Sequence, residues 1–95
     1  MNETTLNGHI NEIRAAAKRI TTTWEAATRV TRINEALDDS VRTELVDLFT
    51  AKATAALEGR RDSEVTAIDS AGIDDESAAR FHADLNRTDI YTLNK

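Results

Sequence analysis

An all-α fold is predicted by three observations on the sequence. The chain of 95 residues contains no proline and only three glycines, so few residues interrupt a helix. Apolar residues recur at spacings of three and four, which is the period of one helix face. No useful run alternates apolar and polar residues as strands do. We expect one domain over residues 1–95, which forms a small bundle of three to four helices. If the core of one copy is insufficient, homodimerisation would complete it.

The first predicted helix covers about residues 4–36 and carries a narrow apolar stripe. The members of this stripe, which we call the seam, are expected to form the core or an oligomer contact: Leu6, Ile10, Ile13, Ala17, Ile20, Trp24 and Ala27. At Val30 the stripe moves round the helix and continues through Ile33 and Leu37. Because β-branched residues within 21–31 weaken helix, residues 4–36 form either one helix with a kink or two helices.

Caps and glycines predict the elements that follow. Asp38 and its neighbours offer acceptors for free backbone N–H groups, and Gly59 is a natural helix end, which gives a helix over about 39–58. Two further helices are expected over about 62–71 and 75–87. The remaining tail, 88–95, holds the apolar residues Ile90, Tyr91 and Leu93, so we expect it to dock on another surface.

Catalytic and metal-binding patterns are missing from the sequence. The absence of cysteine excludes disulfides, zinc thiolates and cysteine nucleophiles. The two histidines, His9 and His82, each stand alone in their segments, and neither supplies a set of three ligands or a nucleophile with its base. No glycine-rich phosphate loop is present. We therefore expect no enzymatic activity, no cofactor and no metal.

A cytoplasmic location without a membrane span is expected. No window approaches the ~18 apolar residues of a spanning helix. The first eight residues contain neither a basic leader nor an apolar stretch of the kind that directs export.

Charge is distributed unevenly along the chain. The formal net charge is -5, and from Asp38 onward thirteen acidic side chains face seven basic ones. A protein partner with a basic surface is therefore predicted to contact acidic residues of this part: Asp38, Asp39, Glu44, Asp47, Asp74, Asp75 and Glu76. The capping of helix starts is the simpler role for several of these carboxylates.

Two groups of charged residues are expected to be solvated. On the first helix, Arg14, Lys18, Arg29 and Arg32 fall within one sector opposite the seam. Arg60, Arg61, Asp62 and Glu64 form a locally balanced run that is expected at an exposed turn.

The run from Ile68 to Ile73 resembles half of a helix-hairpin-helix element, a nucleic-acid-binding motif whose turn contains two glycines. Gly72 matches the first glycine, but Asp74 stands where the second belongs, and Asp75 and Glu76 follow. Three carboxylates at the start of a helix repel phosphate. Binding of nucleic acid is therefore the alternative and not the favoured prediction.

The favoured prediction is a protein that binds another protein, as an inhibitor or adaptor. Helical apolar stripes are present while the chemical constellations are missing, and small acidic proteins of this kind are common among phage and mobile-element products that block host enzymes or defence complexes. The other alternative is a structural protein that self-assembles through the seam. This alternative predicts a homo-oligomer.

Overall fold

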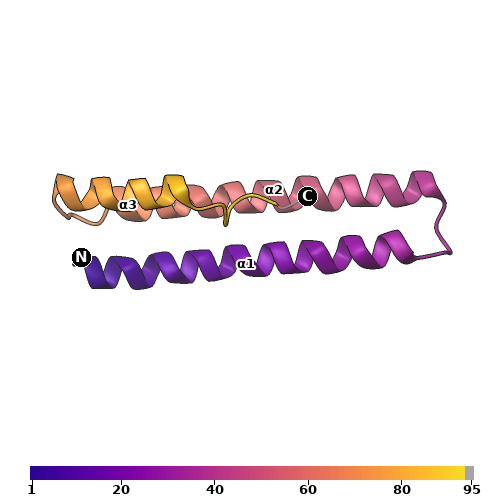
Figure 1. Cartoon of the computed structure of the whole chain (residues 1–95), viewed down its shortest axis with the longest axis horizontal. Coiled ribbons are helices and arrows are strands. Elements are labelled where there is room, and N and C mark those ends of the chain that lie inside the picture. Colours follow the sequence, from indigo (N-terminus) through magenta and orange to yellow (C-terminus); the bar gives the residue numbers. More distant parts are fainter. Residues whose placement is uncertain (94–95) are drawn as a thin grey trace.

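The computed structural model describes residues 1–93 and contains three helices, α1 (Glu3–Ile33), α2 (Asp39–Asp69) and α3 (Asp75–Arg87). α1 and α2 have 31 residues each and run antiparallel as a long hairpin in a rod of 56 × 17 × 16 Å (Figure 1). α3 packs beside the half of the hairpin that holds the amino terminus. The all-α prediction is confirmed, with three helices in the described part of the chain.

α1 is one uninterrupted helix, so the predicted break within 21–31 does not occur. Its stripe also does not move at Val30, because Thr28 and Thr31 occupy the buried positions instead. The Thr28 hydroxyl donates to the Trp24 carbonyl at 2.9 Å, and the Thr31 hydroxyl donates in the same way one turn back along the helix. These bonds satisfy the hydroxyls inside the core, while Val30 is left 63% exposed.

α2 continues through Gly59, so the separate helices expected over 39–58 and 62–71 are one helix. The Ser63 hydroxyl donates to the Gly59 carbonyl at 3.0 Å instead of capping a new helix. A glycine inside a helix costs about 1 kcal/mol relative to alanine. The burial of Leu57 and Ile68 on either side of this glycine favours the continuous helix by more than that cost.

Gly59→Ala is expected to raise the free energy of unfolding by about 0.5 to 1 kcal/mol. A Cβ added at Gly59 meets no atom within 4 Å, and the residue lies mid-helix on the surface. Gly72→Ala is the contrasting variant, because Gly72 has a φ of 69° that favours glycine, and it should be destabilising. Urea denaturation measures both changes. A lower stability of Gly59→Ala would contradict a continuous α2.

The core consists of two clusters along the rod. The first joins all three helices through Leu6, Ile10, Ile68, Ala71 and Leu85. The second joins α1, α2 and the tail through Ala17, Trp24, Ala53, Leu57 and Leu93. The structure therefore buries Leu6, Ile10, Ile13 and Trp24 of the seam within a single chain and half-buries Ile20.

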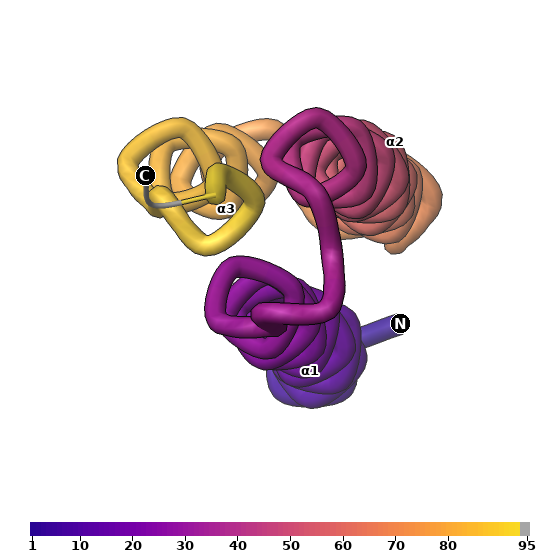
Figure 2. Tube along the Cα trace, turned by 90° about the vertical axis from the view of Figure 1, so that its right-hand side faces the viewer, coloured from indigo at the N-terminus to yellow at the C-terminus, as the bar shows by residue number. Residues whose placement is uncertain are grey.

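The tail docks on the hairpin of its own chain. Ile90 and Tyr91 pack against the second cluster, where Leu93 is 9% exposed. The last two residues of the predicted tail, 94–95, lie outside the described residues. Seen along the rod, α3 lies to one side of the α1–α2 pair, and within residues 1–93 no helix covers the other side (Figure 2).

Candidate functional site

An ion pair around a buried carboxylate joins the two long helices. Glu64 of α2 is 0% exposed, and Arg14 of α1 binds it with two bonds, from Nε to Oε1 at 2.8 Å and from Nη2 to Oε2 at 2.9 Å. The prediction that both side chains are solvated is wrong. Glu64 follows Leu57 by seven residues and precedes Ile68 by four, so it lies in the apolar stripe of α2. That spacing was the signal for burial.

The ion pair also holds the tail and α3. Tyr91 Oη donates to Glu64 Oε1 at 2.6 Å, and Arg14 Nη2 lies 3.1 Å from Asp84 Oδ2. The hydrogen bonds that Arg14 donates to Glu64 raise the pKa of its guanidinium, while burial, followed by the bond that Tyr91 donates to Glu64, raises the pKa of the Tyr91 phenol. We call Arg14, Glu64, Asp84 and Tyr91 the clamp. The Glu64 carboxylate is enclosed, so the clamp links α1, α2, α3 and the tail within the fold.

The ionisation of Tyr91 is expected to occur at higher pH in the folded chain than in the unfolded chain. A raised pKa means that this group contributes stability below the ordinary tyrosine value of about 10, and that the contribution is lost as pH rises through the folded value. Because Tyr91 is the only tyrosine, phenolate absorbance during an alkaline titration measures it directly. Identical titration curves with and without denaturant would contradict the clamp.

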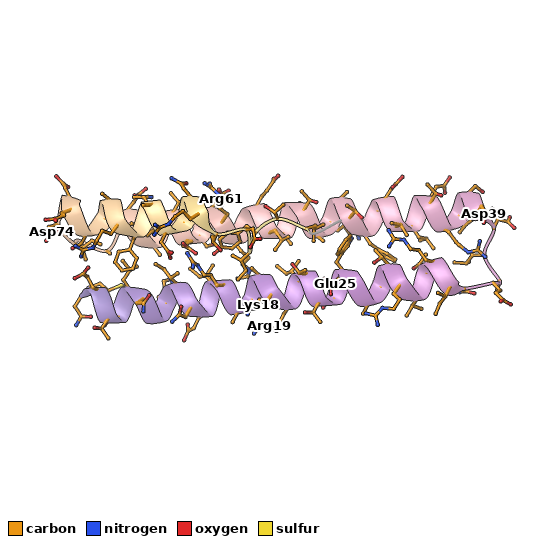
Figure 3. The ribbon with its side chains drawn as sticks, viewed as in Figure 1. Lys18, Arg19, Glu25, Asp39, Arg61 and Asp74 are labelled. Atoms are coloured by element: carbon orange, nitrogen blue, oxygen red, sulfur yellow. The ribbon has the colours of Figure 1, made fainter. Side chains whose placement is uncertain are left out.

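The predicted acidic binding residues do not form one surface. Asp39 and Asp74 lie at opposite ends of the rod (Figure 3). Asp74 caps α3 by accepting a bond from the Ser77 backbone N–H at 2.7 Å, which lowers the pKa of the carboxyl. Asp39 pairs with Arg42, while Asp38 occupies the start of α2 without a side-chain capping bond. The others are exposed near the same two ends: Glu44, Asp47, Asp75 and Glu76.

The two histidines lie in different surroundings, and one of them forms a pair with a carboxylate. His82 Nε2 lies 2.9 Å from Asp69 Oδ1 in a pair that links α3 to α2. No three histidine, aspartate or glutamate side chains of this part are placed to hold a metal ion. None of its helices is long and apolar enough to cross a membrane.

A groove of about 430 Å³ runs between α1 and α2 and has an apolar floor. We call it the open groove, and its lining comes entirely from these two helices: Ala16, Arg19, Ile20, Thr23, Trp24, Ala27, Phe49, Lys52, Ala53, Ala56 and Arg60. By the helical period, these residues lie on the opposite side of the hairpin from Arg14 and Arg61, which bond to side chains of α3. The open groove is therefore the side without a third helix.

Trp24 forms a fixed part of this lining. Its indole Nε1 donates to Thr50 Oγ1 at 2.9 Å, and the residue is 9% exposed. Arg19, Lys52 and Arg60 flank the apolar lining, no carboxylate belongs to it, and none of the three forms an ion pair with another described residue. The open groove thus combines an apolar floor with unneutralised positive charge.

The open groove is not among the predicted sites, although the sequence carries a signal for it. A second run, which shares Ile20 and Ala27 with the seam, repeats its alternating steps of four and three: Ala16, Ile20, Thr23, Ala27 and Val30. Small residues and a threonine fill most of these positions, so the run looks less apolar than the seam itself.

No family model, curated protein or solved structure matches this chain significantly. What the chain does is therefore inferred from its geometry: a three-helix rod whose long hairpin has a covered side and an open side.

Proposed function

We propose that this chain is a non-enzymatic protein-binding protein, an inhibitor or adaptor, and that it holds a segment of its partner in the open groove. The observation that carries this proposal is the apolar lining on the side of the hairpin that α3 leaves uncovered. An apolar groove between two helices is the form of site that receives a helix of another protein.

The apolar surface extends beyond the groove toward the α1–α2 loop. Val30 is 63% exposed, Leu48 is 47% exposed, and both lie in the half of the hairpin that α3 does not reach. Each lies at helical spacing from a residue of the groove lining: Val30 comes three residues after Ala27, and Leu48 comes four residues before Lys52. Exposed apolar residues in helical register with an apolar groove favour contact with a protein.

The nucleic-acid alternative has less support. The Ser77 N–H at the start of α3 is already bonded to Asp74, so it does not point freely at a phosphate. Two of the arginines available for phosphate contacts are engaged, Arg80 with Glu3 and Arg61 with Asn86. The contribution of the acidic residues at the two ends of the rod to partner binding stays a prediction.

The test is an untargeted pull-down of the tagged chain from lysate of its source or host, with and without nuclease, read by mass spectrometry. We expect one stoichiometric protein partner that survives nuclease treatment. If the tagged chain recovers nucleic acid, and the proteins recovered with it are lost after nuclease treatment, the proposal is overturned and the turn around Gly72 is favoured as the site.

A further inference from the structure

We infer that the open groove binds an amphipathic helix of a partner protein whose flanking positions carry acidic side chains. This inference rests on the proposed function and specifies the chemistry of the partner segment. It follows from the length of the apolar strip, from the unneutralised cations beside it, and from what a second copy of the chain would bring to the same place.

The apolar strip, which is the run Ala16, Ile20, Thr23, Ala27 and Val30 of α1, has the length and spacing that suit a helix. From Ala16 to Val30 it covers fourteen steps along α1, which is about 21 Å or about four helical turns. Its residues follow steps of four and three, as do the positions of a helix that packs nearly parallel to its neighbour. A helix of about 15 residues would fill the strip.

The charge beside the strip selects an acidic occupant. The chain has a net charge of -5, yet Arg19, Lys52 and Arg60 are the charged residues of the groove lining. A bound partner removes water from around these three cations, which strengthens their attraction to a negative charge on the partner and raises the energetic cost of a positive one. Carboxylates on either side of the partner's apolar stripe would satisfy all three cations.

A second copy of the chain fits this groove poorly. In a two-fold symmetric pair the same surface of each copy meets the other, so both copies bring Arg19, Lys52 and Arg60 to the interface. Six cations would then share an interface whose lining contains no carboxylate. This arrangement is the reason that we assign the groove to a partner of opposite charge.

Two synthetic helices of about 15 residues test the inference. Both carry leucine at positions separated by four and three, and one has glutamate at the flanking positions where the other has lysine. Trp24 is the only tryptophan and lines the groove, so its fluorescence reports occupancy. We expect the glutamate peptide to bind at least about tenfold more tightly than the lysine peptide, with the difference falling as salt rises.

Charge-reversed variants identify where the preference originates. The triple variant Arg19→Glu, Lys52→Glu and Arg60→Glu should reverse the preference toward the lysine peptide. The matched control, Lys18→Glu, Arg29→Glu and Arg32→Glu, changes the net charge equally at exposed residues of α1 outside the groove. It should leave the glutamate peptide preferred. All six positions are exposed, and circular dichroism verifies that both variants remain helical.

The inference would be overturned if the two peptides bound equally, or if the two triple variants had equal effects on binding. It would also be overturned if light scattering showed a dimer of the chain that only the groove variant disrupts. The proposed function fails separately. If the pull-down still recovers a nuclease-resistant protein partner while the glutamate peptide shows no preference, protein binding stands and only the acidic helix is wrong.

Discussion

Arg14→Ala is expected to lower the free energy of unfolding by about 3 to 5 kcal/mol, because it leaves the enclosed Glu64 carboxylate without its cation. Glu64 is 0% exposed and would keep only the bond from Tyr91. The loss should also loosen the tail, since Tyr91 is held through Glu64 and α3 through Asp84. Urea denaturation followed by circular dichroism measures the change.

Two controls separate the clamp from a general effect of removing an arginine. Arg29→Ala removes an exposed arginine from the same helix and should change stability by no more than about 0.5 kcal/mol. Replacing the clamp by apolar residues, Arg14→Met with Glu64→Leu and Tyr91→Phe, should restore most of the stability, because no charge is then left buried. Equal effects of Arg14→Ala and Arg29→Ala would contradict the clamp.

Trp24→Ala is expected to cost about 3 to 5 kcal/mol, since it removes the largest side chain of the second core cluster. The indole belongs to the cluster that Ala17, Ala53, Leu57 and Leu93 complete, so its loss opens a cavity between α1, α2 and the tail. The melting temperature and the mass in solution measure the outcome.

Thr50→Val is the matched control for Trp24, because it removes only the acceptor of the indole N–H. We expect it to cost about 1 kcal/mol, and so to show how much of the Trp24 effect is hydrogen bonding. If Trp24→Ala left both melting temperature and mass unchanged, the residue would be neither a core anchor nor an interface anchor.

The sequence predicted the helical class, the start of α3 and the core positions of α1 because these follow from local spacing and caps. The helix end predicted at Gly59 is wrong, since helix propensity disfavours glycine by about 1 kcal/mol, whereas burial of the neighbouring residues against α1 is a tertiary effect. Thr28 was also not expected in the core, because threonine is polar. Its hydroxyl donates to a carbonyl of its own helix, so the side chain tolerates burial.

The candidate site was less predictable from the sequence. Glu64 and Arg14 are fifty residues apart, and only the antiparallel pairing of α1 and α2 brings them together. The open groove depends on which side of the hairpin α3 covers, and the run from Ala16 to Val30 marks that side only weakly because most of its positions hold alanine or threonine. The acidic residues are the more visible feature of the sequence, but Asp39 and Asp74, two of the predicted binding residues, lie at opposite ends of the rod (Figure 3).

The central claim, that the open groove is the binding surface, is tested most directly by comparing Ala56→Glu with Ala51→Glu in the pull-down. Ala56 lines the groove one helical turn from both Lys52 and Arg60, so a glutamate there pairs with these cations and blocks the groove without weakening α2. Ala51 is exposed and outside the lining. We predict that Ala56→Glu loses the partner and Ala51→Glu retains it. Equal recovery of the partner by both variants would contradict the claim.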